Sequence, residues 1–179
     1  MDGRMPFLTF YVPTYKRPKM LADCLASIKA QSDSDYEVLV VRDEVGIGID
    51  GMYRDIRNHA GDVSGEYVFV LSDDNLVTDA DFVKGLKEQA ADGPDVIVFK
   101  NEIVGILPSI WGSAPELGQI DLSCFAVKRE VWQRHAADWG ACYAGDFYFI
   151  RALWDAGYLF KWWDKLVIKA QKIMRGMPE

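Results

Sequence analysis

Residues 67–71 form an apolar run that ends abruptly in the polar sequence Ser72-Asp73-Asp74-Asn75. A run rich in β-branched and aromatic residues is typical of a strand that is buried on both faces. Such a strand has no room for adjacent acids, so Asp73 and Asp74 are expected where it leaves the core. Ligands bind at this end of the strands in open α/β sheets, and two carboxylates there suit Mg²⁺ or Mn²⁺ holding a diphosphate. A polar turn is the alternative, since Asp and Asn are common turn residues.

Strands and helices are predicted to alternate along the first hundred residues. The predicted strands are residues 7–12, 36–41, 67–71 and 95–99, and the predicted helices are residues 18–30, 52–59 and 80–91. Alternation of this kind favours right-handed βαβ crossovers. We therefore expect an α/β fold with a mostly parallel sheet flanked by helices.

The second half of the chain has a different pattern. It begins with a loop-rich region around Trp111 and continues with predicted strands at residues 120–127, 158–163 and 166–168 and predicted helices at residues 128–137 and 146–156. With 179 residues, the chain is expected to form one domain with one continuous sheet.

The three cysteines, Cys24, Cys124 and Cys142, form no CxxC pair. An odd number without such a pair favours reduced thiols over a disulfide framework or a zinc site. Residues 1–6 have no apolar signal core, and no run is long enough to span a membrane. We expect a soluble, cytoplasmic protein.

The net charge of −7 is unevenly distributed. From Arg151 onward, six Lys and Arg face three acids, which gives +3 and leaves −10 on residues 1–150. This basic, aromatic end is able to contact an anionic acceptor, a lipid surface or nucleic acid. We favour the interpretation that its aromatic rings cover the core while its lysines extend to water.

Four polar clusters follow predicted strands or open a predicted helix. They are Pro13-Thr14-Tyr15-Lys16-Arg17-Pro18, Arg42-Asp43-Glu44, Ser72-Asp73-Asp74-Asn75 and Gly145-Asp146. Loops that leave one edge of a parallel sheet converge, so the clusters are expected to form a single site.

The ordered set of these motifs resembles a family 2 glycosyltransferase of the GT-A fold, over nearly the whole chain. The residues that carry the resemblance are the Pro13-to-Pro18 motif, Asp43, Arg57-Asn58, Gly65-Glu66-Tyr67, the acidic DXD-type motif at Asp73-Asp74, and Gly145-Asp146 with Arg151 five residues later. In this family, residues 1–100 correspond to a nucleotide-sugar-binding half and residues 101–179 to an acceptor-side half.

The sequence departs from the family pattern at three places. Arg42-Asp43-Glu44 stands in place of Asp-Asp-Gly-Ser, so the contact with uracil depends on Asp43 alone. Gly145-Asp146 stands in place of a Glu-Asp pair, so one acid is left. The Gln-x-x-Arg-Trp element of processive synthases is missing, which argues against a processive polymerase.

The resemblance implies metal-dependent transfer of a sugar, with inversion, from a nucleotide-diphosphate donor to an acceptor hydroxyl. UDP-sugars are the favoured donors, and the acceptor is a glycan, a lipid-linked sugar, a small molecule or a modified DNA base. The acidic body argues against nucleic acid, because phosphate contacts need clustered Lys and Arg.

The resemblance also assigns roles to individual residues. Asp74 is the implied ligand of Mn²⁺ or Mg²⁺, with Asp73 on the ribose or sharing the metal, and Asp146 is the implied catalytic base. The implied nucleotide-binding residues are Pro13, Thr14, Tyr15, Arg17, Asp43, Arg57 and Asn58.

Two alternatives stay open. Asp is a favoured N-cap, so Asp146 also fits a purely structural role, with Glu102 and Asp121 next in line as the base. A non-catalytic sugar-nucleotide-binding or scaffold module of the same fold is the alternative function. A nucleotidyltransferase is less favoured, because no Gly-rich signature loop follows the first strand.

Overall fold

The structure is a computed structural model that describes residues 5–103, 105–140 and 142–171. Its elements in chain order are β1 (Leu8–Thr14), α1 (Pro18–Lys29), β2 (Tyr36–Arg42), α2 (Gly48–Asn58), β3 (Tyr67–Val70), β4 (Asn75–Val77), α3 (Phe82–Ala90), β5 (Val96–Glu102), β6 (Ile106–Leu107), η1 (Leu122–Cys124), β7 (Phe125–Lys128), α4 (Arg129–Arg134), η2 (Ala136–Asp138), α5 (Gly145–Asp155) and β8 (Phe160–Ala170).

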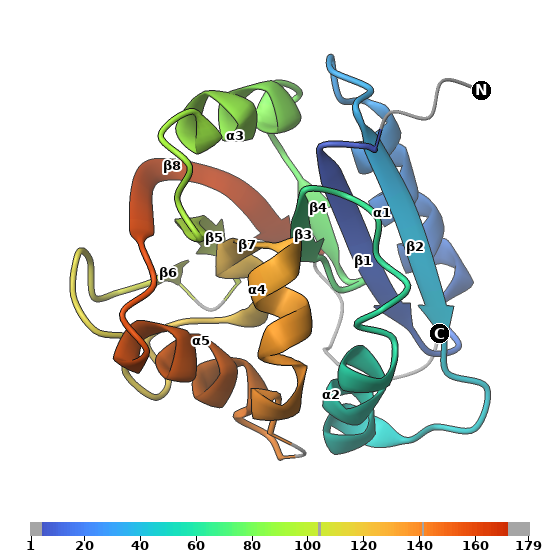
Figure 1. Cartoon of the computed structure of the whole chain (residues 1–179). Helices are drawn as coiled ribbons and strands as arrows, with labels where there is room; N and C mark the ends of the chain where they lie inside the picture. The colour runs from blue at the N-terminus through green and yellow to red at the C-terminus, as the bar shows by residue number, and fades with distance from the viewer. Residues whose placement is uncertain (1–4, 104, 141, 172–179) are drawn as a thin grey trace.

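The strands form one twisted sheet in the order β2-β1-β3-β7-β5-β8-β4, with β6 beside β5 (Figure 1). The α/β class and the single continuous sheet are as predicted, but the sheet is mixed rather than mostly parallel. Among the described residues, three strand pairings are parallel and four are antiparallel. The reason is β7, which follows a long loop and runs antiparallel between β3 and β5. The βαβ alternation holds only for β1 to β3.

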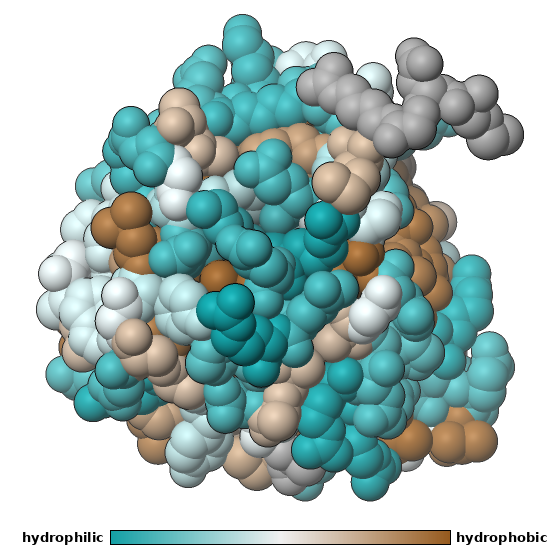
Figure 2. Space-filling view, in the orientation of Figure 1, coloured by the Kyte–Doolittle hydropathy of each residue, from teal (hydrophilic) through white to brown (hydrophobic). Residues whose placement is uncertain are grey.

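Helices cover both faces of the sheet. Buried residues of α2, α4 and α5 pack in one hydrophobic cluster, and buried residues of α1 and α3 pack in a second one. All residues of β1 and β3 are buried, which explains why β3 is apolar throughout and β1 is largely so. In Figure 2, hydrophilic residues predominate over the centre of this face, where α4 lies, and the buried residues of α2, α4 and α5 are turned toward the sheet.

Three elements differ from prediction. Residues 75–77 form the short strand β4, which was not predicted, because they pair with residues 168–170 of β8. β8 is one strand of 11 residues rather than two, and its polar residues Asp164 and Lys165 lie at a register shift against β5. Residues 122–124 form a 3₁₀ turn, since the Asp121 carboxylate accepts a hydrogen bond from the Ser123 N–H.

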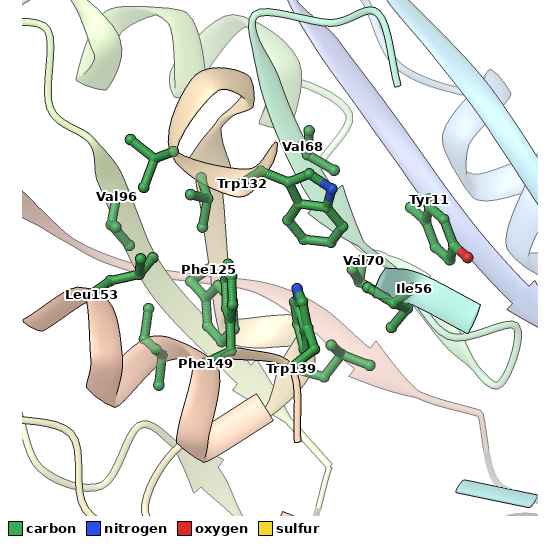
Figure 3. Packing of buried hydrophobic residues seen from close by; sticks show 14 of the residues in the cluster. Tyr11, Ile56, Val68, Val70, Val96, Phe125, Trp132, Trp139, Phe149 and Leu153 are labelled. Atoms are coloured by element: carbon green, nitrogen blue, oxygen red, sulfur yellow. The ribbon is translucent and has the colours of Figure 1, made fainter. Parts of the chain in front are cut away.

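An aromatic cluster fixes the start of α5. The indole of Trp139 stacks on the ring of Phe149 in α5, with centroids 4.1 Å apart, and on the ring of Tyr53 in α2, with centroids 5.7 Å apart. Trp132 of α4 meets Trp139 edge to face, as Figure 3 shows. Such pairs contribute roughly 0.5–1.5 kcal/mol beyond their burial. The cluster therefore holds α2 and α5 in a fixed relation.

The basic end of the chain packs as the favoured interpretation predicts. Trp162 and Trp163 pack against the two hydrophobic clusters. Lys161 and Lys169 form ion pairs with Asp92 and Glu102 at the surface. Lys172 and Arg175, which belong to the same basic end, lie outside the described residues. Within the described part of the chain, no helix has the length and apolar character needed to cross a membrane.

Candidate active site

A cleft of about 860 Å³ lies where the predicted polar clusters converge. The turns that follow β1, β2 and β3 contribute Thr14, Asp43 and Asp74 to its lining, and the start of α5 contributes Asp146. Pro13, Tyr15 and Arg17 also line it. Pockets of about 300–1,000 Å³ are typical of sites for small molecules and cofactors. The cleft is therefore large enough for a nucleotide sugar.

The two acids of the Asp73-Asp74 motif have different surroundings. The side chain of Asp73 is fully buried; its Oδ2 accepts a hydrogen bond of 2.6 Å from Thr14 Oγ1, and its Oδ1 lies 2.5 Å from Nη2 of Arg17. Asp74 reaches the cleft, and its Oδ2 lies 3.1 Å from Nη1 of Arg17. Burial raises the pKa of Asp73, while Thr14 and Arg17 offset part of that rise. Asp74 is thus the acid presented to a ligand, and Asp73 lies beneath it.

These surroundings determine how a metal ion fits. No group of three or more His, Cys, Asp or Glu side chains is placed to hold a metal within residues 5–103, 105–140 and 142–171. Mg²⁺, however, is often held by one or two carboxylates together with substrate phosphates. Asp74 fits this mode, whereas both oxygens of Asp73 already contact Thr14 or Arg17. The site suits an ion that arrives with a diphosphate, rather than a preformed protein cage.

Asp43 organises the loop after β2. Its Oδ1 accepts hydrogen bonds from the N–H groups of Val45 and Gly46, and its Oδ2 accepts one from Ile47. Burial acts to raise the pKa of Asp43, but these three donors lower it overall. A carboxylate has about four acceptor positions, so one is left for a ligand.

Gly46, in the same loop, lies in close contact with the ring of Tyr15. Its φ of +84° favours glycine, and a Cβ at this position would lie 2.6 Å from the hydroxyl oxygen of Tyr15. The loop and Tyr15 thus form one continuous wall of the cleft.

Asp146 lies in the first turn of α5, but it does not cap the helix, whose N-cap is Ala144. Its Oδ2 accepts a hydrogen bond of 3.0 Å from the Leu122 N–H, and its Oδ1 accepts one of 2.8 Å from the Phe147 N–H. Burial, followed by the charge of Asp121, raises the pKa of Asp146 to about 6, even though these donors lower it. A carboxyl with a pKa near neutrality is suited to accept a proton during a reaction.

Besides Asp73, which lies beneath Asp74, two predicted site residues do not line the cleft. Arg57 and Asn58 are exposed and do not belong to its lining. The physical reason is that α2 begins at Gly48 rather than at residue 52, so its first turns face the cleft and its last turn faces solvent.

Several lining residues were not predicted. Gly48, Ile49, Met52 and Tyr53 of α2 line the cleft, and so do Leu117 and Ile120 of the long loop. The spacing of Ile49, Met52 and Tyr53 is that of one helix face, and an earlier start of α2 would have revealed it. Leu117 and Ile120 show no comparable spacing pattern in the sequence.

Comparison with known proteins gives matches of two kinds, to a family model and to solved structures. The model of the family described as Glycosyl transferase family 2 matches residues 9–47, which run from β1 through the Asp43 loop. Among solved structures, S. aureus TarS 1–349 in complex with UDP-GlcNAc matches with a TM-score of 0.68 and 15% identity over 96% of this chain. The mannosyltransferase PcManGT from Pyrobaculum calidifontis, in complex with GDP-Man and Mn²⁺, matches with a TM-score of 0.70 and 16% identity over 97% of this chain.

The predicted resemblance to family 2 glycosyltransferases is confirmed over residues 9–47, and the solved structures confirm the predicted fold. The chain covers only 60% of that TarS chain and 59% of the PcManGT chain. A197 from STIV shares the fold with a TM-score of 0.60 and 13% identity, and this chain covers 97% of its length. No curated protein matches the sequence. The GT-A fold places the cleft described above at the carboxyl ends of β1, β2 and β3.

Proposed function

We propose that this protein is a metal-dependent, inverting glycosyltransferase that uses a nucleotide-sugar donor, with UDP-sugars favoured. The observation that carries the proposal is the placement of Asp74 and Asp146 in one cleft, in different electrostatic surroundings. Asp74 forms an ion pair with the Arg17 guanidinium, whereas the pKa of Asp146 is raised to about 6. Carboxyl groups whose environments differ in this way are typical of sites where each has its own chemical role.

In this proposal, the nucleotide occupies the side of the cleft near β1 and β2. Tyr15 and Pro13 line the base and ribose pocket, and Asp43 accepts a hydrogen bond from the uracil imide. Arg17 contacts both acids of the motif in the structure, so it is placed to interact with a diphosphate. Thr14 holds Asp73 and thereby fixes the turn that presents Asp74.

The chemistry needs charge neutralisation and a base. Asp74 would hold a divalent ion together with the diphosphate, and the ion would supply Lewis acidity for the departing negative charge. The Asp146 carboxylate takes the proton of the acceptor hydroxyl as its oxygen forms a bond to the anomeric carbon. The bond from that carbon to the diphosphate breaks, and the diphosphate leaves with the electron pair. Attack on the face opposite the leaving group inverts the anomeric centre.

The thiols support the expected compartment. Cys24 and Cys124 are buried and Cys142 is partly buried, and all three are free. Free thiols are typical of a reducing environment, so we propose that the enzyme acts in the cytoplasm. The predominance of negative charge on residues 1–150 favours acceptors other than nucleic acid.

A thermal-shift panel tests the proposal directly. The melting temperature is measured with UDP-, GDP-, CDP- and dTDP-sugars, each with and without Mn²⁺. A ligand that binds the folded state raises its apparent stability by mass action. We expect stabilisation by UDP-sugars that needs Mn²⁺. If no nucleotide sugar stabilises the protein with or without Mn²⁺, the proposal is wrong.

The Asp43 contact predicts a preference for UDP over CDP. Uracil presents an N–H where cytosine presents an unprotonated nitrogen, and mispaired buried polar groups cost roughly 1–3 kcal/mol. This corresponds to a roughly 5- to 150-fold difference in affinity. Asp43→Asn should remove the preference, because an amide is able to donate to cytosine. Isothermal titration calorimetry of both nucleotides measures it.

Glu44→Gln is the matched control for this measurement. Glu44 is the exposed neighbour of Asp43 and does not line the cleft, so its substitution should keep the preference. Equal affinities of the wild-type protein for UDP and CDP would remove Asp43 from base recognition.

A further inference from the structure

We propose that Tyr53 is a positioning residue whose hydroxyl orients the Asp146 carboxylate, and that Gly145 leaves the space in which the Tyr53 ring lies. This inference rests on the proposed role of Asp146 as the catalytic base. It adds a residue that the sequence motifs did not indicate.

The ring of Tyr53 is held rigidly. Only 2% of the residue is exposed, and its ring stacks on Trp139 with an interplanar angle of 18°. Trp139 in turn stacks on Phe149 of α5 with an interplanar angle of 11°. Since the stack joins α2 to α5, the ring is fixed relative to the helix that carries Asp146.

Gly145 is required by space rather than by backbone conformation. A Cβ at position 145 would lie 2.6 Å from Cγ and Cδ2 of Tyr53 and 2.4 Å from the carbonyl oxygen of Gly140. None of these three atoms is the mobile end of a flexible side chain. Any larger residue at position 145 would therefore displace the Tyr53 ring or the backbone at Gly140. The glycine that stands in place of the family's acid thus makes room for the tyrosine.

The hydroxyl of Tyr53 interacts with both the carboxylate and the backbone N–H of Asp146. Tyr53 and Asp146 line the same cleft, and the ring of Tyr53 lies against position 145. There the hydroxyl acts as a donor toward the Asp146 carboxylate, which lowers the pKa of Asp146, and as an acceptor toward the Asp146 N–H. Together with the Leu122 and Phe147 N–H groups, three donors from separate segments fix the plane of the carboxylate. The ring of a phenylalanine would fill the same space but would not supply this donor.

The charged and titratable groups around Asp146 set the expected direction of change. Asp121 raises the pKa of Asp146, and the hydrogen bond from Tyr53 lowers it. The thiol of Cys124 also faces Asp121 and Asp146, and burial raises its pKa, so it stays neutral. Loss of the Tyr53 hydroxyl removes a donor to the charged form of Asp146. The pKa of Asp146 should therefore rise further above its present value of about 6.

The test is the pKa of Asp146, measured by ¹³C NMR of the side-chain carboxyl carbon in Tyr53→Phe and assigned with Asp146→Asn. We expect a rise of about one unit, since a hydrogen bond to the charged form favours that form. The acid limb of the kcat/KM profile should shift by the same amount. Tyr148→Phe is the matched control, because Tyr148 lies on α5, is 52% exposed and does not line the cleft; it should leave the pKa unchanged.

Gly145→Ala tests the same contact between Tyr53 and Asp146 with a second substitution. By displacing the Tyr53 ring, it should raise the pKa of Asp146 in the same direction, and adding Tyr53→Phe to it should produce little further change. An unchanged Asp146 pKa in Tyr53→Phe would overturn the inference. If the pKa rises as expected but the wild-type protein transfers no sugar, the positioning role stands and the proposed function fails.

Discussion

Asp146→Asn should lower the rate of sugar transfer by about two to four decades, the usual contribution of a positioned general base, while donor and metal binding persist. An amide has the shape of the carboxylate but accepts no proton from the acceptor hydroxyl. The measurement is steady-state transfer kinetics, together with calorimetry of the donor nucleotide. The structure also predicts a small change in stability. The Asn side chain has only one acceptor oxygen for the N–H groups of Leu122 and Phe147, which lowers stability. The substitution also removes a partly buried charge, which offsets this loss.

The pH dependence provides an internal control for this variant. The wild-type kcat/KM should rise with pH through the Asp146 pKa of about 6, because the deprotonated form is the active one. The residual activity of Asp146→Asn should lack this limb. If Asp146→Asn transfers sugar at nearly the wild-type rate, Asp146 is structural and Asp121, which also lines the cleft, becomes the next candidate. The other sequence-based candidate, Glu102, forms an ion pair with Lys169 and does not line the cleft.

Asp74→Ala should abolish the Mn²⁺-dependent part of nucleotide binding and leave the fold intact. Its side chain contributes no packing to the core, and the Gln171 N–H donates to its backbone carbonyl rather than to its carboxylate. Arg17 keeps its contact with Asp73 in the variant, so weak metal-independent binding of UDP is expected to survive. Calorimetry with UDP, with and without Mn²⁺, separates the two contributions.

Asp23→Ala is the charge-matched control for Asp74→Ala. Asp23 is exposed on α1 and does not line the cleft, so this change should leave the Mn²⁺ effect as it is in the wild-type protein. If Mn²⁺ still strengthens UDP binding to Asp74→Ala, the metal ligand has been assigned wrongly.

Local sequence patterns predicted most of the first half of the fold. The buried parts of β1, β3 and β5 are mainly apolar because both faces of the sheet are covered. The pairing of β4 with β8 joins residues about 90 positions apart, and no local pattern encodes it. Asp164 and Lys165 have the composition of a turn, but the residues on both sides of them pair with β5, so β8 continues through the register shift. Tertiary contacts decided both cases.

The candidate site was predictable to the extent that strand ends meet at one edge. Asp43 and Asp74 follow β2 and β3, the two strands that pair in parallel with β1 on either side, so the sheet itself brings them to one edge. The burial of Asp73 depends on Thr14 and Arg17, which are distant in the sequence. The position of Tyr53 depends on the absence of a side chain at Gly145. Contacts between distant segments leave no periodic signal in the chain.

Release of UDP from a panel of UDP-sugars in the presence of Mn²⁺, compared between the wild-type protein and Asp146→Asn, tests the central claim most directly. An enzyme cleaves its donor slowly with water even when its acceptor is absent, and the proposed base activates that water as it would the acceptor. We predict release above the buffer rate for at least one UDP-sugar, with a marked fall in Asp146→Asn. Binding of a UDP-sugar with release no faster than in buffer would contradict this account and indicate a non-catalytic binding module.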